Sequence, residues 1–339
     1  METAVEYAVE LEDLTKRFIA RTLGENGGRK AVRSEIAAVD HIDLRIRRGE
    51  LFGLLGPNGA GKTTTIRMLC TLLEPTEGVA RVWGYDVLRH PAEVLRHLGV
   101  VLTGERSVYW KLTGRENLEY FAALYHVRPQ IARLRIAELL ERVELAERAD
   151  DLVERYSTGM RQRLALIKAM IHDPPILLLD EPTTGLDPQA ARNIRDLIRH
   201  LYRVEGKTIV LTTHHMEEAD QLCERVGIID HGRIIALDSP QALKRSLGQG
   251  RVLRLELDRV DDEVAPVLRT LPGVSQVTVH QPSQDGNWEV TLQLADVREA
   301  LPRAVDAMSR RGIQLRHLQL IEPSLEDVFI ALTGRRLRD

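Results

Sequence analysis

Short apolar runs alternate with amphipathic stretches over residues 1–240 of the chain. Runs such as 176–180 and 208–213 are rich in apolar and β-branched residues, which is typical of parallel strands buried on both faces. From about 88 to 172 the apolar residues are spaced three and four apart, which predicts amphipathic helices. This alternation predicts an α/β fold with a covered, mostly parallel sheet. Its strands are predicted at 5–14, 38–46, 51–55, 176–180 and 208–213.

The polar segment 21–36 separates the first two predicted strands and carries four basic and two acidic side chains. Glycine-containing polar segments of this kind usually connect elements at the protein surface. We therefore expect a solvated loop, and a patch that binds a partner is the alternative.

The pattern changes after residue 240, where short strands and helices follow in the order β-α-β-β-α-β. This order predicts a small α+β domain of ferredoxin-like type over 241–339. Ser324 and Asp327 have the spacing of a capping box that opens a last helix. On that helix Leu325, Val328, Phe329 and Leu332 are expected to pack on their own domain. The strands are predicted at 251–258, 274–280, 287–294 and 313–321, and the helices at 262–270 and 297–311.

Composition narrows the classes of protein that these elements can build. A length of 339 residues suits two domains, and 43% hydrophobic residues exclude a disordered chain. With 47 Lys and Arg against 50 Asp and Glu the net charge is −3, which argues against a nucleic-acid partner. Two cysteines, Cys70 and Cys223, indicate a reducing compartment. No apolar run reaches the roughly 20 residues of a membrane span, and the acidic N-terminus does not resemble a signal peptide.

Residues 56–63, GPNGAGKT, fit the P-loop pattern GxxxxGK[ST] and lie between a predicted strand and a predicted helix. The glycines allow backbone N–H groups to converge on phosphate oxygens, and the following helix presents its positive end. Lys62 offers a flexible cation for the phosphates, and the Thr63 hydroxyl is an oxygen ligand suited to Mg²⁺. A tight turn with an incidental lysine is the alternative.

A second acidic motif ends the apolar run 176–180, where Asp180 is followed by Glu181. In P-loop enzymes a carboxylate at a strand end holds the Mg²⁺ shell. A carboxylate one residue later can orient or deprotonate the attacking water. An unrelated pair of charges at a strand end is the alternative.

These motifs together resemble those of the ATP-binding subunits of ABC transporters, and the resemblance covers residues 5 to about 240. The similar segments are GPNGAGKTT (56–64, Walker A), YSTGMRQRL (156–164, in the place of the signature), ILLLDEP (176–182, Walker B with the catalytic glutamate), TTGLDP (183–188, the D-loop) and TIVLTTHHMEEADQLCERV (208–226, the switch-histidine region). The resemblance implies a P-loop cassette with an N-terminal antiparallel sheet and a helical subdomain at about 98–160.

The resemblance also implies a role for each matching residue. Glu181 and His214 are implied to be catalytic, with Thr63 and Asp180 holding Mg²⁺. The residues implied to bind ATP are Phe18, Gly56, Pro57, Asn58, Gly59, Ala60, Gly61, Lys62, Thr63 and Thr64. Those implied to act on the ATP of a second subunit are Ser157, Thr158, Gly159 and Met160, with Gly185, Leu186 and Asp187 in the D-loop.

Elementary chemistry bears on three of these side chains. His214 follows a predicted strand, where an imidazole can contact a γ-phosphate and polarise the water–glutamate pair; a structural histidine is the alternative. His215 invites a metal site, but adjacent residues on a strand point to opposite faces, which argues against it. Phe18 follows the first strand, so we expect it to stack on adenine, and a core position is the alternative.

Two departures from the family pattern stand out. Thr158 replaces the first glycine of the signature, while Ser157 and Gly159 remain. Where the family usually has a glutamine after the strand, this chain has Thr103, Gly104 or Glu105, depending on a one-residue shift. We hypothesise that the ATPase works but is tuned differently.

The tail EPSLEDVFIALTGR (322–335) is similar to the C-terminal signature of daunorubicin-resistance-type subunits, which belong to ABC type-2 exporters of drugs, lipids or polysaccharides. The resemblance implies a dimer with a second copy or a paralogous subunit, separate transmembrane permease subunits that dock on the helical subdomain, and a cytoplasmic location on the inner face of the cell membrane. The alternatives are a regulatory subunit with weak hydrolysis and a soluble ABC ATPase without a transport role. Translation factors of the latter class carry two cassettes, and repair ATPases carry long heptad coiled coils, neither of which the sequence contains.

Overall fold

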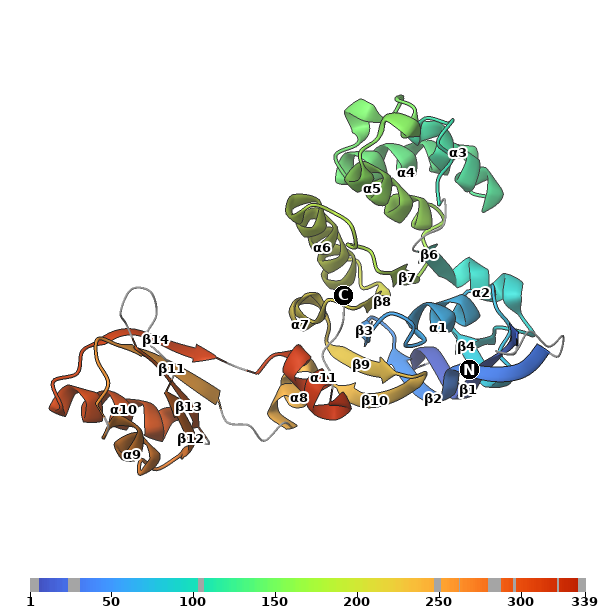
Figure 1. Cartoon of the computed structure of the whole chain (residues 1–339). Helices are drawn as coiled ribbons and strands as arrows, with labels where there is room; N and C mark the ends of the chain where they lie inside the picture. Colours follow the sequence, from blue (N-terminus) through green and yellow to red (C-terminus); the bar gives the residue numbers. More distant parts are fainter. Residues whose placement is uncertain are drawn as a thin grey trace. The chain divides into compact units, whose positions relative to one another are not determined.

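The computed structural model describes the chain in two compact units, one that extends to Pro240 and one that begins at Gln241 (Figure 1). The described residues are 6–23, 31–102, 107–246, 251–261, 263–279, 288–294, 297–321 and 323–334. Thr103, Gly104 and Glu105, the positions offered in place of the family's glutamine, lie outside them.

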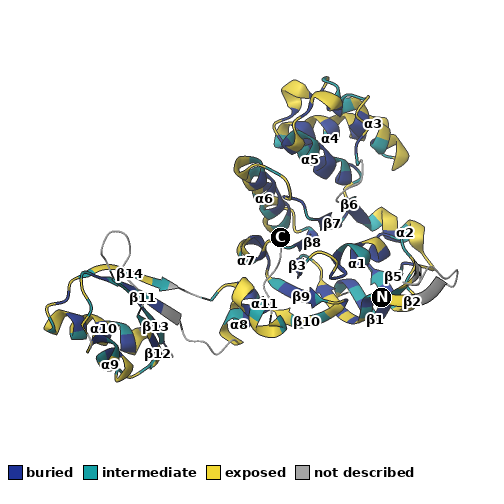
Figure 2. Ribbon diagram, in the orientation of Figure 1, coloured by how far each residue is buried: buried dark blue, intermediate teal, exposed yellow. Residues whose placement is uncertain are grey.

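Six strands form the central sheet of the first unit, in the order β10-β9-β3-β8-β7-β6. The neighbours from β9 to β6 run parallel, and the edge strand β10 is antiparallel to β9. Every residue of β3, β7 and β8 is buried, as the dark blue of Figure 2 shows, which confirms the predicted parallel sheet. The strands are β3 Leu51–Leu55, β6 Leu98–Val101, β7 Ile176–Asp180, β8 Thr208–Thr213, β9 Arg225–Asp230 and β10 Arg233–Asp238.

A second, antiparallel sheet has the order β2-β1-β4-β5 and contains β1 Tyr7–Leu23, β2 Ala31–Arg47, β4 Glu77–Val82 and β5 Tyr85–Asp86. The expected polar loop at 21–36 is wrong for most of its length, because β1 and β2 pair as far as Leu23 and Ala31. Polar strand residues mimic a loop where both faces of a two-stranded ribbon meet water. Ile19 and Ile36, in this part of the ribbon, are indeed exposed.

Helices pack around these sheets. α1 Lys62–Leu69 contacts β2, β4 and β7, so it lies between the two sheets. α6 Pro188–Arg203 and α7 Met216–Leu222 both pack against β8. α2 Pro91–His97 contacts β4, β5 and β6. The P-loop helix and the segments that follow β7 and β8 are thereby gathered around one sheet.

The helical block predicted from about residue 98 begins later than expected. Residues 98–101 form β6, which pairs with β7 in the central sheet. A four-residue apolar run between helical patterns cannot be assigned from periodicity, which explains the error. The helices of the block are α3 Gly114–Leu124, α4 Pro129–Arg142 and α5 Thr158–Ala169, with short 3₁₀ turns at Ala146–Arg148 and Val153–Arg155.

The second unit has one antiparallel sheet, in the order β12-β13-β11-β14. With the two intervening helices this is the predicted ferredoxin-like order, and β11, β12 and β13 share a core with α9 and α10. Ser324 and Asp327 form the predicted capping box. Leu325, Val328 and Phe329 are buried, whereas Leu332, one turn later, is exposed, contrary to expectation. The elements are α8 Pro240–Ser246, β11 Arg251–Leu257, α9 Val264–Arg269, β12 Val274–Val279, β13 Trp288–Leu294, α10 Val297–Arg310, β14 Leu315–Ile321 and α11 Leu325–Thr333.

Across the described part of the chain, no helix combines the length and the apolar character needed to cross a membrane.

Candidate active site

The loop from β3 to α1 packs its backbone tightly against distant parts of the chain. A Cβ atom on Gly56 would lie 2.2 Å from the carbonyl oxygen of Ile229, and one on Gly61 would lie 2.4 Å from that of Ala38. Gly61 also has a φ of 112°, which side chains disfavour. The glycines therefore hold the loop at the first turn of α1, whose unpaired N–H groups favour an anion.

The ammonium group of Lys62 is folded over this loop. It donates hydrogen bonds to the carbonyl oxygens of Gly56 at 2.8 Å and Pro57 at 3.1 Å. It also lies 3.6 Å from Glu181 Oε1. Burial lowers the pKa of Lys62, and the charges of Glu181 and Asp180 oppose that shift. A cation is thus placed where phosphate oxygens can replace the carbonyl and carboxylate partners.

Asp180, at the end of β7, is buried and fully engaged with hydroxyl groups. The Thr63 hydroxyl donates to its two carboxylate oxygens at 3.1 and 3.0 Å. The Thr212 hydroxyl, from β8, donates to Asp180 Oδ1 at 2.5 Å. One hydroxyl and one carboxylate, both oxygen donors, are what Mg²⁺ takes from a protein when the substrate's phosphates supply further ligands.

Glu181 adopts a left-handed backbone conformation with a φ of 48°. Its N–H donates to Thr212 O at 3.0 Å, and its side chain accepts hydrogen bonds from Thr184 Oγ1 at 3.1 Å and His214 Nδ1 at 3.0 Å. Burial alone would raise the pKa of Glu181, but His214, Lys62 and Thr184 together lower it below its usual value. The carboxylate is therefore kept ionised in a mostly dry site.

His214 and His215 do not point to opposite faces, as we expected from a strand. Their ring centroids lie 4.1 Å apart with a tilt of 40°. The reason is that β8 ends at Thr213, and His215 is already the N-cap residue of α7. Within the described ranges no group of three or more His, Cys, Asp or Glu side chains could hold a metal ion.

The signature residues form the exposed start of α5. Ser157 is the N-cap residue and accepts a hydrogen bond from Met160 N at 3.2 Å. Thr158 is exposed and its hydroxyl lies 3.4 Å from Arg161, which also donates to Tyr156 O at 2.7 Å. Ser157 and Thr158 therefore face solvent, whereas Gly159 is buried and Met160 is half-buried.

The D-loop leads into α6 next to the signature helix. Gly185 has a φ of 73°, and Asp187 caps α6 by accepting a hydrogen bond from Ala190 N at 2.9 Å. Leu186 between them is half-buried. A Cβ atom on Gly159 would lie 3.0 Å from Ala190 Cβ, so only a glycine lets α5 and α6 approach this closely.

Phe18 lies on β1 opposite Ile36 of β2, and both side chains are exposed. Ile36 is two residues before Ala38, whose carbonyl oxygen lies against Gly61. Phe18 is therefore an exposed aromatic on the strand pair that adjoins the P-loop, not a core residue. Of the other residues predicted to bind ATP, Gly56, Ala60 and Gly61 are buried, Pro57, Thr63 and Thr64 are half-buried, and Asn58 and Gly59 are exposed.

Comparison with known families decides the assignment. Residues 39–184 match the model of the ABC transporter family, and residues 239–333 match the C-terminal domain of ATP-binding proteins like DrrA1-3. The chain is 41% identical to the daunorubicin resistance ATP-binding protein DrrA2 of Streptomyces coeruleorubidus, over 97% of this chain and 96% of that protein. It is 37% identical to the linearmycin resistance ATP-binding protein LnrL of Bacillus subtilis, over 89% and 95%.

The chain belongs to the ATP-binding subunits of ABC transporters, in the daunorubicin-resistance branch. It is an ATP-binding and ATP-hydrolysing subunit. The first unit also resembles the solved ATP-binding cassette MJ0796, a dimer bound to ADP and Pi, with a TM-score of 0.59 and 28% identity over 68% of this chain and 98% of that one. These matches confirm the predicted family and fold.

Sequence reasoning missed several groups in the active site of this ABC subunit. Thr212 bonds both Asp180 and Glu181, and Thr184 bonds Glu181. Both threonines lie inside the matched segments 183–188 and 208–226, but threonine at such positions is also common as a strand or turn former. The carbonyl oxygens of Ile229 and Ala38 lie against the P-loop glycines. No short sequence pattern predicts these contacts, because they depend on the fold.

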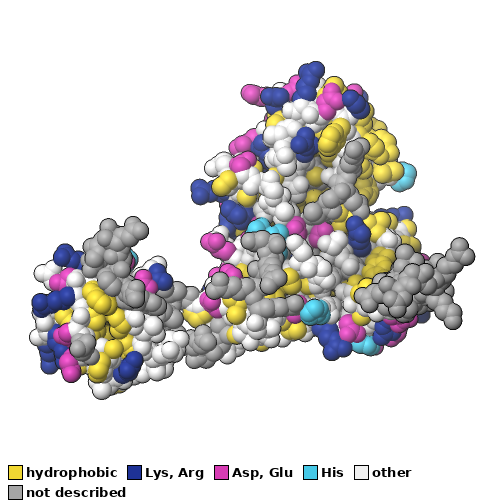
Figure 3. Space-filling model, in the orientation of Figure 1, with side chains coloured by type: hydrophobic (Ala, Val, Ile, Leu, Met, Phe, Trp, Pro, Cys, Tyr) yellow, Lys and Arg dark blue, Asp and Glu magenta, His cyan; other side chains and the backbone are white. Residues whose placement is uncertain are grey.

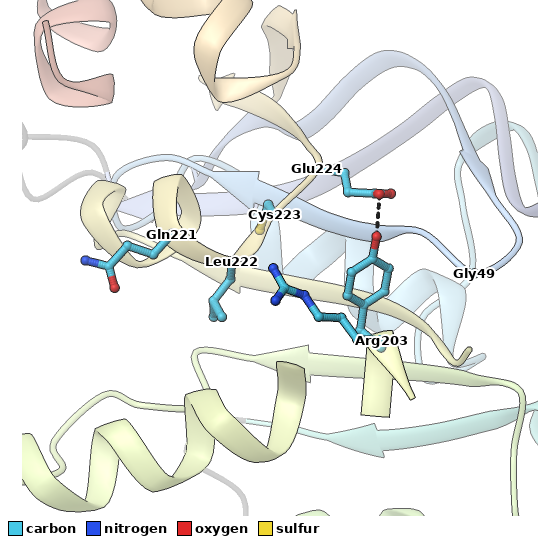
Figure 4. A pocket seen from close by; sticks show the side chains of 7 residues that line it. Gly49, Arg203, Gln221, Leu222, Cys223 and Glu224 are labelled. Atoms are coloured by element: carbon cyan, nitrogen blue, oxygen red, sulfur yellow. Dashed lines mark hydrogen bonds between the residues drawn. The ribbon is translucent and has the colours of Figure 1, made fainter. Parts of the chain in front are cut away.

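A polar cleft of about 490 Å³ opens elsewhere on the first unit (Figure 4). Its lining residues are Gly49, Tyr202, Arg203, Gln221, Leu222, Cys223 and Glu224. The Tyr202 hydroxyl donates to Glu224, and burial, helped by that carboxylate, raises the pKa of Tyr202 to about 12. Gly49 precedes β3 whereas the P-loop follows it, so this cleft lies at the opposite end of the strand and contains none of the predicted site residues.

Proposed function

We propose that this ABC subunit powers the export of apolar, drug-like molecules through separate membrane subunits. The observation that supports it best is the bonded cluster of Lys62, Thr63, Asp180, Glu181 and His214, drawn from α1, β7 and the segment after β8. The names of the relatives, which refer to daunorubicin and linearmycin resistance, favour drugs over lipids or polysaccharides as cargo.

In this proposal the P-loop binds the phosphates of ATP. Lys62 exchanges its contacts with Gly56 O, Pro57 O and Glu181 for the β- and γ-phosphates. The first turn of α1 adds its N–H groups, and Thr64 lies on that turn. Phe18 stacks on the adenine ring, for which its exposed position beside the P-loop is suited.

Thr63, at the end of the P-loop, and Asp180, at the end of β7, would hold Mg²⁺, because their side-chain oxygens are adjacent. Bound there, the ion would neutralise charge on the transferred phosphoryl group. Thr212 keeps the Asp180 carboxylate in place through its own hydroxyl.

Glu181 and His214 act on the attacking water. The carboxylate of Glu181 remains ionised because its pKa is lowered, so it can orient the water and accept its proton. His214 bonds Glu181 Oε1 and thereby fixes the side chain that faces the water. The two groups are already 3.0 Å apart, so little reorganisation is needed at the moment of reaction.

The site is completed by a second copy or a paralogous subunit. Ser157, Thr158, Gly159 and Met160 start α5, where Ser157 and Thr158 are exposed, and such an N-terminus favours an anion such as a γ-phosphate. Gly185, Leu186 and Asp187 lie beside it at the start of α6. The dimeric state of the similar cassette MJ0796 supports this arrangement.

The helical block is proposed to dock on the membrane subunits at the inner face of the cell membrane. Tyr109, Trp110, Tyr120 and Tyr125 are all at least 39% exposed around α3, and Figure 3 shows hydrophobic side chains gathered on this block. Exposed aromatic residues are enriched where proteins bind one another. A partner helix with an apolar face would cover them.

The experiment that tests the proposal measures ATP hydrolysis, drug accumulation and co-purification from solubilised membranes for the unaltered chain and two variants. Glu181→Gln should reduce hydrolysis by about 10²-fold or more while ATP still binds. The matched control, Glu217→Gln, alters an exposed glutamate on α7 and should hydrolyse ATP normally. Cells with Glu181→Gln should accumulate the drug.

Two results would overturn parts of the proposal. Hydrolysis that survives Glu181→Gln would contradict the catalytic assignment. If Glu181→Gln loses hydrolysis as expected, but no membrane protein co-purifies with the chain and drug accumulation does not change, export is contradicted.

A further inference from the structure

One buried hydrogen bond of the first unit lies next to the active site without belonging to any matched role. Thr183 Oγ1 donates to Glu218 Oε2 at 3.0 Å, and the two residues are only 8% and 4% exposed. The other carboxylate oxygen, Glu218 Oε1, is buried and has no hydrogen-bond partner within the described ranges. Burying a carboxylate with an unsatisfied oxygen lowers the stability of the folded chain. A functional role would explain why this arrangement is present.

The positions of the two residues suggest that purpose. Thr183 is two residues after Glu181, in the segment that leads to the D-loop. Glu218 is four residues after His214, in the first turn of α7. Their hydrogen bond therefore ties the segment that carries Glu181 to the helix that follows His214.

The backbone of Glu181 explains why such a tie is needed. Its φ of 48° is unfavourable for a residue with a side chain, and such conformations persist only where the surroundings enforce them. Thr212 holds the N–H of Glu181 from the strand side. Thr183, on the far side of the strained residue, is held by Glu218.

We propose that Glu218 is a positioning residue which, through Thr183, sets the geometry of Glu181 relative to His214. The inference rests on the proposed catalytic roles of Glu181 and His214. Neither Thr183 nor Glu218 touches the reacting atoms in this account. Their effect should therefore appear in the rate of the chemical step and not in the affinity for ATP.

The test compares four variants of the full chain in single-turnover and steady-state ATP hydrolysis. Thr183→Val removes the hydroxyl at nearly constant volume and should lower kcat about tenfold, with the KM for ATP changed less than about twofold. Glu218→Met removes the acceptor at similar side-chain length and should have a similar effect. Thr183→Ser keeps the hydroxyl and should restore kcat to within about twofold of the unaltered chain.

The fourth variant, Thr208→Val, is the matched control. Thr208 is buried and its hydroxyl accepts a hydrogen bond from Gly49 N, but it starts β8 at the end away from the active site. It should lose a similar amount of thermal stability as Thr183→Val, since each removes one buried hydrogen bond. Its kcat should be unchanged.

A double variant separates positioning from a merely structural role. In a His214→Ala background, Thr183→Val should lower kcat by less than about twofold further, because the geometry that it protects no longer exists. Additive losses, or a Thr208→Val variant as slow as Thr183→Val, would overturn the inference. If Glu181→Gln abolishes hydrolysis while Thr183→Val and Glu218→Met keep a normal kcat, this inference fails and the proposed function stands. If Glu181→Gln hydrolyses ATP normally, the proposed function itself fails.

Discussion

The Walker motifs and the signature segment lie in one compact unit, yet they are built in opposite ways. Lys62 and Asp180 are 4% and 1% exposed, and each has a partner from another part of the chain: Lys62 pairs with Glu181, and Asp180 accepts a hydrogen bond from Thr212. Ser157 and Thr158 are exposed, and among the residues that the structure describes their hydroxyl groups have the partners Met160 N and Arg161, from their own helix.

The difference shows what each region needs in order to work. The buried cluster is organised before substrate arrives, and its charges compensate one another at short distance. At the start of α5, Ser157 caps the helix by accepting a hydrogen bond from Met160 N, and Ser157 and Thr158 are exposed. A helix terminus built in this way is complete only when another molecule supplies the anion, so the contrast itself supports a site shared between two chains.

The largest effect is expected from Asp180→Asn, which attacks the buried cluster. The amide would lack the negative charge to which the Thr63 and Thr212 hydroxyl groups donate hydrogen bonds. It would therefore hold a divalent cation poorly. Hydrolysis should fall at least about a hundredfold, as expected for the loss of a few kcal/mol of charge stabilisation. The measurement is the rate of ATP hydrolysis as a function of Mg²⁺ concentration.

Asp173→Asn is the control for this change, because Asp173 pairs with Lys207 before β7 and is largely exposed. Its rate should match that of the unaltered chain. An Asp180→Asn rate within tenfold of normal at saturating Mg²⁺ would contradict the view that the buried cluster carries the chemistry.

The next largest effect should come from Ser157→Ala on the exposed side of the comparison. A charge-assisted hydrogen bond to phosphate is worth about 1.5–3 kcal/mol, so hydrolysis by the dimer should fall about tenfold or more. Ser324→Ala is a matched control, since Ser324 caps α11 as Ser157 caps α5. Both should lose about 1 kcal/mol of stability through the cap, measured by thermal unfolding. Equal hydrolysis by the two variants would show that Ser157 is only a helix cap.

The sequence predicted the buried cluster better than its surroundings. Lys62, Thr63 and Asp180 belong to local patterns whose spacing is itself the signal, and the structure brings them together. Thr212 could not be found in the same way, because its contact with Asp180 depends on the pairing of β7 with β8. Long-range contacts of this kind depend on the register in which strands pair, which no short segment of the sequence reveals.

The errors in the fold have a similar cause. The end of the ribbon of β1 and β2, within 21–36, was expected to be a polar loop because exposed strands carry no one-sided apolar pattern. Residues 98–101 were assigned to a helical block because four apolar residues cannot distinguish β6 from a helix. The side chains of His214 and His215 were misplaced because β8 ends at Thr213, before either residue.

The pH dependence of stability offers a smaller test of the buried cluster. The pKa of Glu181 is lowered in the folded chain against the opposing effect of burial, with His214 the first of the groups responsible. The ionised form therefore contributes stability above the ordinary pKa of 4.5, and this contribution is lost as the pH falls through the lower folded value. In His214→Gln the loss of stability between about pH 6 and about pH 3 should be shallower. Thermal unfolding at both pH values measures it, with His215→Gln as the control, and an unchanged slope would contradict the coupling.

The smallest effect should come from Thr158→Gly, which restores the glycine that the family usually has. Thr158 is exposed, and the polar contact that the described residues give it, to Arg161, is long at 3.4 Å, so little is lost by removing it. Glycine in the first turn of α5 should cost about 0.5–1 kcal/mol of stability through the entropy of the unfolded chain. Because Ser157 and the helix N-terminus are untouched, hydrolysis should stay within about threefold of normal. A rise of tenfold or more would instead mean that Thr158 slows the enzyme, and that the exposed side of the site controls the rate as strongly as the buried side.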